Sequence, residues 1–269
     1  MRTALTIAGS DSGGGAGIQA DLKTFAAHGV YGLSVITAVT AQNTLGLAAF
    51  EVLSADLVTA QIRAVVSDIG AHAAKTGMLA NAAIVEAVAG AVDALGIPQL
   101  VVDPVMTTTS GDRLTNDEAV GAIKSELLRC AFVVTPNIPE AETLAGIPIP
   151  TEDARREAAR RIMAFGPGAV IIKGGHLPSP DIVDLLYDGH RFVEFRTERV
   201  AGRSTHGTGC TFAAAVTAQL ALGHPLEDAV PRAQRYMAGA IRAAPGLGQG
   251  RGPMDHFWKT PASQSPDVR

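Results

Sequence analysis

Short runs of apolar residues recur along the chain, and most of them are continuous rather than alternating with polar positions. Continuous apolar runs of about four to eight residues are typical of strands in a parallel sheet that helices cover on both faces. We predict such strands at residues 4–8, 33–41, 71–77, 99–105, 131–136 and 169–175.

Segments between and after these runs carry apolar residues at helical spacing. They predict helices at residues 55–68, with Ser54 as N-cap, and at residues 82–95, 117–129, 153–165, 209–222 and 226–243. Residues 181–200 instead predict two strands around an Asp188-Gly189 turn. The expected fold class is α/β: a doubly wound, mostly parallel central sheet with helices on both faces and an antiparallel hairpin at its edge.

The chain shows no linker rich in proline or serine, no internal repeat and no block of charge before residue 259. A single domain over residues 1–258 is therefore the simplest organisation. The polar, proline-containing residues 259–269 are predicted to form a flexible tail. Of the 269 residues, 47% are hydrophobic, which is enough for a sizeable globular core.

Composition and charge argue against several classes of protein. With a formal net charge of −4 and 4% aromatic residues, the chain lacks the basic surface and the rings that nucleic-acid-binding proteins use. No apolar run has the length of a membrane span and the N-terminus lacks a signal-peptide pattern, which predicts a cytoplasmic protein without a membrane partner. Cys130 and Cys210 form no CxxC pair and the histidines show no HExxH spacing, which argues against a built-in zinc site.

Ligands of an open parallel sheet bind at the carboxyl ends of its strands, so candidate binding and catalytic residues are expected there. The first strand ends in AGSDSGGGAGIQAD, residues 8–21, whose glycines let backbone approach a ligand although neither GxxxxGK[ST] nor GxGxxG is present. The second ends in TAQNT, where the Gln42 amide can both donate to and accept from the edge of a small heterocycle. The structural alternatives are an ordinary glycine-rich turn and a glutamine that serves loop backbone.

Acidic residues follow two later strands. Asp103 leaves an apolar strand just before Pro104, and a buried carboxylate there must pair with a cation or with hydrogen-bond donors. Asn137 and Glu140 leave the next strand together, where a helix begins near Ile138. For these two residues, a helix cap and a favourable first-turn glutamate are the alternative to a functional role.

The stretch THGTGCT, residues 205–211, precedes an apolar run of small residues. If Gly207 to Gly209 form a turn and a helix begins at Cys210, unpaired backbone N–H groups and the helix dipole create an anion hole suited to phosphate. A helix N-terminus lowers a thiol pKa, whereas a nearby phosphate raises it. The alternative for Cys210 is a buried, small hydrophobic side chain.

The order of these motifs resembles that of the hydroxymethylpyrimidine and phosphomethylpyrimidine kinases of thiamine biosynthesis, in the ribokinase-like superfamily: AGSDSGGGAGIQAD, AQNT, KTGM, VDPVM, TPNIPEAE, KGGH and THGTGCT. The resemblance runs from about residue 4 to residue 258 and includes the C-terminal PGLGQGRGPMDHFW. It implies a homodimer that uses ATP and Mg²⁺ to phosphorylate 4-amino-5-hydroxymethyl-2-methylpyrimidine, and then its monophosphate, to the diphosphate.

The same resemblance implies a role for each matching residue. Those expected around the pyrimidine are Gly9, Asp21, Gln42 and Met78. Those expected around the nucleotide are Asn137, Lys173 and Thr205. The expected magnesium-side acids are Asp103 and Glu140, and the expected catalytic residues are Gly207, Thr208, Gly209 and Cys210. Cys210 stands where most ribokinase-like kinases carry an aspartate base, so it is either a base or a group that orients the hydroxymethyl.

Two positions depart from the family pattern. Thr109 and Ser110 stand where the family commonly has AKSG, and Gln234 stands where a lysine is common. Each departure removes a positive charge, so we expect weaker ATP binding or a weaker second phosphorylation than in the family. The alternative is that these positions lie on the solvated surface, where the loss of charge has no effect. Two other functions stay open: a pyridoxal kinase with the same cysteine, and a non-catalytic sensor of pyrimidine phosphate, against which the joint presence of Asp103, Glu140 and Cys210 argues.

Overall fold

The computed structural model describes residues 1–107, 111, 114–175, 181–202 and 204–259, and an open sheet forms its centre. Eight strands from these residues build the sheet: β1 (Thr3–Ala8), β2 (Tyr31–Ile36), β5 (Ala73–Thr76), β6 (Leu100–Val102), β7 (Val133–Val134), β8 (Val170–Ile172), β9 (Asp181–Tyr187) and β10 (Phe192–Glu198). Their order is β10-β9-β8-β7-β6-β5-β1-β2. Strand β9 pairs antiparallel with β8 and β10, and the other pairs are parallel. The predicted parallel sheet with an antiparallel edge hairpin is confirmed.

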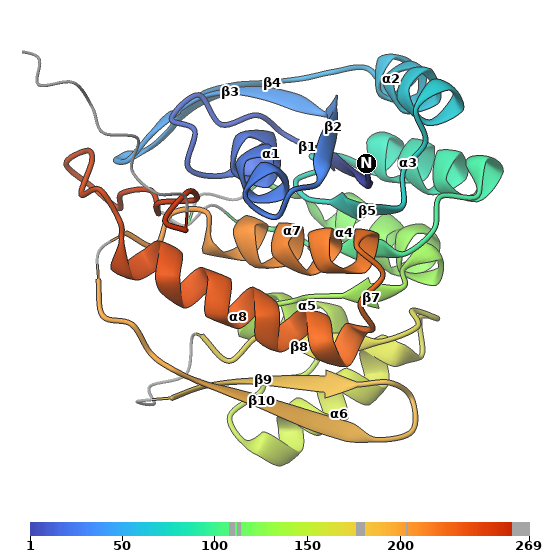
Figure 1. The fold of residues 1–269 in the computed structure, drawn as a ribbon. Helices are drawn as coiled ribbons and strands as arrows, with labels where there is room; N and C mark the ends of the chain where they lie inside the picture. The colour runs from blue at the N-terminus through green and yellow to red at the C-terminus, as the bar shows by residue number, and fades with distance from the viewer. Residues whose placement is uncertain (108–110, 112–113, 176–180, 203, 260–269) are drawn as a thin grey trace, which may run out of the picture.

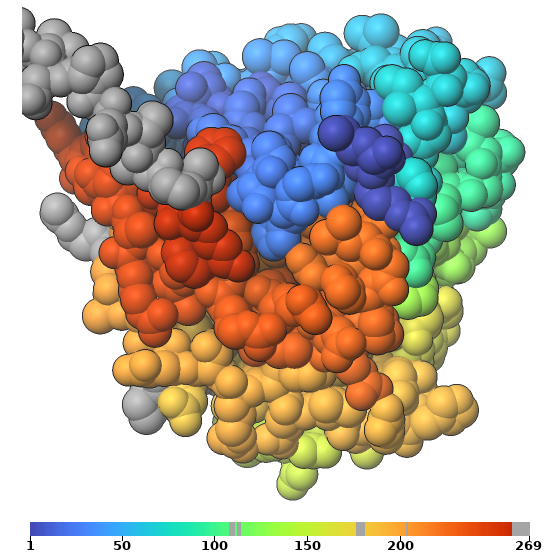
Figure 2. Space-filling view, in the orientation of Figure 1, coloured from blue at the N-terminus to red at the C-terminus, as the bar shows by residue number. Residues whose placement is uncertain are grey.

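Helices cover both faces of this sheet (Figure 1). One face carries α1 (Gly17–Ala27), α7 (Thr208–Ala221) and α8 (Leu226–Arg242). The other carries α2 (Ala55–Asp68), α3 (Ala82–Leu95), α4 (Asp117–Ala122), α5 (Ile138–Ala145) and α6 (Glu152–Met163). Figure 2 shows the orange and red-orange atoms of α7 and α8 between the blue N-terminal part of the chain and the hairpin β9–β10.

Burial on both faces explains the continuous apolar runs. In β6, Val101 belongs to the core that α7 and α8 complete, whereas Val102 belongs to the core beneath α2 and α3. Both side chains are fully buried. Successive residues of a strand point to opposite faces, so a strand covered on both sides has no polar position to alternate with.

The predicted strand over residues 33–41 is wrong, because the chain breaks at Thr37 into β2 and a second strand, β3 (Ala38–Asn43). Strand β3 pairs antiparallel with β4 (Gly46–Val52) in a separate two-stranded sheet, with a bulge between Ala41 and Gln42. The Thr37 hydroxyl donates to the Met78 carbonyl at 2.7 Å, and the Thr37 carbonyl accepts from the Leu53 N–H at 2.9 Å. These bonds direct the chain out of the main sheet, and the apolar pattern continues through them unchanged.

Two helical segments also differ from the prediction. Helix α1 is not predicted, and its first residues belong to the glycine-rich segment over residues 8–21. The segment predicted as one helix over residues 117–129 is α4 followed by a π-helical turn (Ile123–Leu127) and a 3₁₀ turn (Leu128–Cys130). Each of the three buries apolar residues against the core, so the hydrophobic pattern does not distinguish them. By contrast, the Ser54 N-cap is confirmed, because its hydroxyl accepts from the Leu57 N–H at 3.3 Å.

The domain organisation stays a prediction: one domain over residues 1–258 and a flexible tail over residues 259–269, of which 260–269 lie outside the described residues. In the described part of the chain, every helix is too short or too polar to cross a bilayer.

Candidate active site

A cavity of about 430 Å³ lies at the carboxyl ends of the parallel strands. Residues that follow β1, β5, β6, β7 and β8 meet the N-terminal turn of α7 and the hairpin β3–β4 in its wall. Twelve of the thirteen predicted site residues line it: Gly9, Gln42, Met78, Asp103, Asn137, Glu140, Lys173, Thr205, Gly207, Thr208, Gly209 and Cys210. The remaining residue, Asp21, does not.

A buried ion pair forms one side of the cavity. Lys173 Nζ donates to Asp103 Oδ1 at 2.9 Å, and the side chains of Asp103 and Lys173 are 1% and 13% exposed. Burial alone would lower the pKa of Lys173, but the charges of Asp103 and Glu140 raise it above its usual value. Asp103 Oδ2 is buried and accepts no hydrogen bond in the described part of the chain. The cavity wall therefore contains a buried carboxylate oxygen that is open to a ligand, a water or an ion.

Asn137 and Glu140 do form a helix cap, the alternative left open for them. The Asn137 side chain accepts from the Glu140 N–H at 3.0 Å, and the Glu140 carboxylate accepts from the Asn137 N–H at 2.8 Å. The capping box also places Glu140 in the cavity wall. Burial raises the pKa of Glu140 to about 7, while the charge of Lys173 opposes this increase and that of Asp103 adds to it. Capping and a role in the site are therefore compatible.

The N-terminal turn of α7 forms the wall beside this ion pair. The helix begins at Thr208, one residue before the predicted segment 209–222 and two before the start at Cys210 assumed for the anion hole, with Gly207 as N-cap. Gly207 has φ 79°, and a Cβ there would overlap the Gly15 carbonyl oxygen, so only glycine fits this turn. The N–H groups of Gly209 and Cys210 donate no hydrogen bond within the described residues. A Cβ built on Gly209 would lie 3.6 Å from Lys173 Nζ. The start of α7 and the Lys173 ammonium are therefore close enough to bind one anion together.

Cys210 is partly buried at this turn. Burial raises the pKa of its thiol to about 11; the charge of Lys75 opposes the increase, and the carboxylates of Asp21 and Asp103 add to it. The expected lowering by the helix N-terminus is therefore outweighed, and the thiol keeps its proton at neutral pH.

Asp21 does not line the cavity in this structure, and its place near the pyrimidine stays a prediction. Asp21 lies on the sheet-facing side of α1 and is fully buried, and its Oδ2 accepts from Lys75 Nζ at 2.9 Å and from the Thr6 hydroxyl at 2.6 Å. Lys75 and Thr6 are paired neighbours on β5 and β1, so they present both donors to the same face of the sheet. Asp21 thus acts on the cavity through its charge near Cys210 rather than by lining it.

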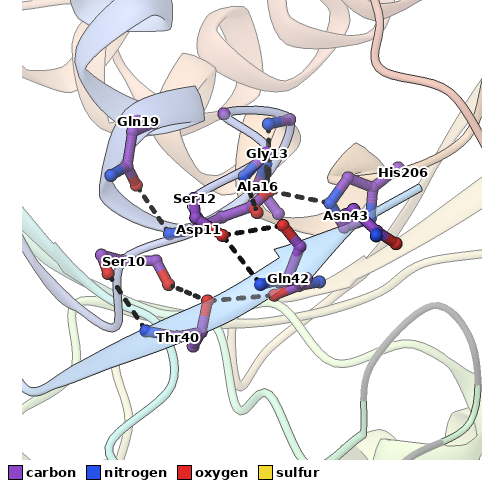
Figure 3. Close-up of polar contacts among 12 residues, drawn as sticks. Ser10, Asp11, Ser12, Gly13, Ala16, Gln19, Thr40, Gln42, Asn43 and His206 are labelled. Atoms are coloured by element: carbon purple, nitrogen blue, oxygen red, sulfur yellow. Dashed lines mark hydrogen bonds and ion pairs between the residues drawn. The ribbon is translucent and has the colours of Figure 1, made fainter. Parts of the chain in front are cut away.

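Asp11 organises the glycine-rich loop, a role that the sequence analysis did not assign (Figure 3). Its carboxylate accepts from the N–H groups of Gly13, Gly15 and Ala16 and from His206 Nε2, the last at 2.8 Å. Burial alone would raise the pKa of Asp11, but the hydrogen bond and charge of His206 and the backbone donors lower it. The pair joins the loop after β1 to the turn before α7. Its sequence clue is weak: both residues flank motif glycines but lie 195 positions apart.

Gln42 reaches the cavity from the bulged end of β3. Ser12 fixes the Gln42 backbone, because the Ser12 hydroxyl donates to the Gln42 carbonyl and accepts from the Gln42 N–H, both at 2.7 Å. Thr40 is similarly tied to Ser10, whose carbonyl accepts from the Thr40 hydroxyl at 2.8 Å. The Gln42 side-chain NH₂ has no protein acceptor among the described residues. It can therefore donate to an acceptor atom on the edge of a small ring.

A family model described as phosphomethylpyrimidine kinase matches residues 11–255. The chain belongs to the phosphomethylpyrimidine kinase family. It is 51% identical to the hydroxymethylpyrimidine/phosphomethylpyrimidine kinase of Rhizobium meliloti over 95% of this chain and 98% of that protein.

This member of the phosphomethylpyrimidine kinase family is also similar to a longer bifunctional protein and to a solved pyridoxal kinase. It is 49% identical to the thiamine biosynthesis bifunctional protein of Geobacter sulfurreducens over 94% of this chain, but spans only 52% of that relative's length. The solved ADP complex of Bacillus subtilis pyridoxal kinase is also similar, with 39% identity, a TM-score of 0.88, and coverage of 95% of this chain and 97% of that one.

Gln234, where the family commonly has lysine, is not solvated surface. It is 6% exposed and lines the cavity. Its Nε2 donates to Asp184 Oδ2 at 2.8 Å and to the Phe195 carbonyl at 3.2 Å, and Asp184 also lines the cavity. The neutral amide therefore stands beside a buried carboxylate in the cavity wall. The other departures, Thr109 and Ser110, lie outside the described residues.

Proposed function

We propose that this protein uses ATP to phosphorylate the hydroxymethyl group of 4-amino-5-hydroxymethyl-2-methylpyrimidine and then the resulting monophosphate. Membership of a kinase family implies ATP as phosphate donor. The observation that carries the proposal is that one cavity is lined by Gln42, by the open N–H groups of α7 and by the Asp103–Lys173 pair. Phosphoryl transfer needs this combination of a substrate reader and groups that stabilise charge more than it needs covalent chemistry.

The pyrimidine end of the cavity takes a flat ring with polar edges. Gly9 and Met78 face each other, since a Cβ on Gly9 would lie 3.2 Å from the Met78 sulfur. The Gln42 amide supplies a donor and an acceptor for the ring nitrogen and the amino group of the pyrimidine. The hydroxymethyl group would then point to Cys210 and the turn of α7, where its phosphorylation takes place.

The phosphate end supplies positive potential from fixed groups. The N–H groups of Gly209 and Cys210 and the Lys173 ammonium face the place where charge develops on the transferred phosphoryl group. Asn137 and Thr205 border the same region, in keeping with contacts to the nucleotide.

The residues present fit a magnesium ion. Asp103 Oδ2 is a buried carboxylate oxygen without a partner in the described residues, and Glu140 is the second carboxylate of the wall. Mg²⁺ is ordinarily held by one or two carboxylates together with waters and substrate phosphates, so a cluster of three acidic or histidine ligands is not required. The described residues contain no such cluster. When bound, the ion would neutralise charge on the triphosphate.

Cys210 keeps its proton during binding and orients the hydroxymethyl oxygen. With a pKa of about 11, the thiol is a poor base at neutral pH. A loose phosphoryl-transfer transition state makes little demand on a base, because bond formation to the attacking oxygen lags behind bond breaking. The hydroxyl proton then leaves late, to a phosphoryl oxygen or to water, as ADP departs. Of the two roles considered from the sequence, the orienting role is therefore the one we propose.

The deciding experiment incubates the protein with ATP, Mg²⁺ and one ring alcohol at a time, and weighs the products. We expect the hydroxymethylpyrimidine to gain one and then two phosphoryl groups, with a higher kcat/KM than pyridoxal. Pyridoxal is the second candidate because of the similarity to the Bacillus subtilis pyridoxal kinase. A higher kcat/KM for pyridoxal, or no transfer to the pyrimidine, would refute the proposal. A homodimer and a cytoplasmic location stay predictions.

Replacing Gln234 with lysine is expected to lower the KM for ATP by about three- to tenfold, because an ammonium beside Asp184 would offset a negative charge in the cavity wall and so lessen its repulsion of the triphosphate, an effect of roughly 1 kcal/mol. Steady-state kinetics with varied ATP check this, and Gln234→Met serves as the neutral control. An ATP KM that is equal in the wild-type and lysine proteins would show that the missing charge at this position has no role in nucleotide binding.

A further inference from the structure

The C-terminal motif PGLGQGRGPMDHFW has no role in the site described so far. Its residues 246–253, here called the strap, follow α8 and reach the tip of hairpin β3–β4. In Figure 2 the red C-terminal atoms lie against the blue N-terminal part of the chain. Arg251 of the strap lines the cavity.

The strap grips one residue of the hairpin tip, Thr44. The Gly250 N–H donates to the Thr44 hydroxyl at 3.3 Å, and the Arg251 N–H donates to the Thr44 carbonyl at 3.0 Å. The approach is so close that a Cβ on Gly250 would overlap the Thr44 carbonyl oxygen, and a Cβ on Gly248 would overlap the Thr44 side chain. Contact with Thr44 therefore explains two of the motif's glycines, Gly248 and Gly250.

The other end of the strap is tied to the phosphate side of the cavity. The His206 N–H donates to the Gly252 carbonyl at 3.3 Å, and His206 pairs with Pro253 in an isolated parallel bridge. Just beyond the strap, the Tyr236 hydroxyl donates to the His256 carbonyl at 2.7 Å. The strap thus runs between the tip that follows Gln42 and the turn that precedes Gly207.

Such a tie matters because the hairpin stands apart from the main sheet. A two-stranded sheet is at best marginally stable by itself, and the bulge at Gln42 interrupts its pairing there. Ser12 fixes the Gln42 backbone, and the strap holds the hairpin tip at Thr44, two residues further along. Without it, the polar end of Gln42 would sample positions that do not match the ring.

We propose that Thr44 is a positioning residue, through which the strap keeps Gln42 in a fixed position relative to the phosphate-binding turn. The substrate named here rests on the proposed function. Thr44 touches no reacting group in this scheme. Its loss is therefore expected to weaken binding of the pyrimidine while leaving the nucleotide side and the chemistry largely intact.

The test compares Thr44→Val, which removes the hydroxyl, with Thr44→Ser, which keeps it. We expect Thr44→Val to raise the KM for the hydroxymethylpyrimidine about three- to tenfold, with kcat and the KM for ATP within about twofold of wild type. Thr44→Ser should restore wild-type values. Thr59→Val, on α2 and away from the cavity, is the matched control for the change of side chain.

Hydrogen–deuterium exchange of the ligand-free protein tests the tie independently of the substrate. Thr44→Val should speed exchange in residues 38–46 and leave α7 unchanged. Unchanged exchange there, or a pyrimidine KM equal to wild type, overturns the inference, as does an equal rise of both KM values, which would indicate general loosening. Wild-type protein that fails to phosphorylate the pyrimidine refutes the proposed function instead, and the exchange result then decides the role of Thr44.

Discussion

Replacing Asp103 with asparagine is expected to lower kcat by about 10²- to 10³-fold, the range found when one group that stabilises transition-state charge is removed. The amide keeps the shape of the side chain but loses the charge that Lys173 and a magnesium ion require. Lys173 Nζ lies 2.9 Å from Asp103 Oδ1, so the substitution also leaves a buried ammonium with weaker compensation. Steady-state kinetics over a Mg²⁺ titration check this, with a higher Mg²⁺ requirement expected alongside the fall in kcat.

Two further variants separate chemistry from folding. Asp93→Asn removes a carboxylate that is 49% exposed and outside the cavity wall, and it should leave kcat unchanged. Combining Asp103→Asn with Lys173→Met removes both members of the buried pair, which should recover thermal stability lost in the single variant without recovering activity. A single variant with kcat within threefold of wild type and an unaltered Mg²⁺ dependence would place the magnesium ion elsewhere.

The strand ends are what made the site predictable from sequence. A doubly wound sheet gathers the carboxyl ends of its parallel strands at one edge, so polar residues at the ends of apolar runs, such as Asp103 and Asn137, could be expected to meet in one cavity. Lys173, the ion-pair partner of Asp103, was expected only from the family resemblance. The glycines around Cys210 predicted the anion hole, because the first turn of a helix leaves backbone N–H groups without intrahelical partners.

Side-chain partners that form across the fold were not predictable in this way. The pattern marks Asp21 as polar, but only the packing of α1 on the sheet brings it to Lys75, 54 positions later, and withdraws it from the cavity. Thr37 likewise sits inside an apolar run, and its bonds to Met78 and Leu53 split the predicted strand. A hydrophobic pattern records burial and periodicity, whereas these outcomes depend on which polar groups meet inside the core.

Replacing Cys210 with alanine is expected to lower kcat about 10²-fold while changing the affinity for the pyrimidine less than threefold, because the thiol acts on the hydroxymethyl group in the transition state more than on the ring. Equal losses in kcat and affinity would indicate a binding role. The measurements are kcat from steady-state kinetics and the pyrimidine Kd from calorimetry without ATP.

Serine at the same position separates the two roles of the thiol. Burial raises the pKa of Cys210 to about 11, so an orienting group that keeps its proton can be replaced by a hydroxyl, whereas a thiolate base cannot. We therefore expect Cys210→Ser to retain activity within about tenfold of wild type. In a Cys130→Ser background, alkylation of Cys210 by iodoacetamide should be slow at pH 7.5 and rise towards pH 11. An alkylation midpoint near pH 7, together with an inactive serine variant, would instead make Cys210 the base, because both results require the thiolate to be the working form.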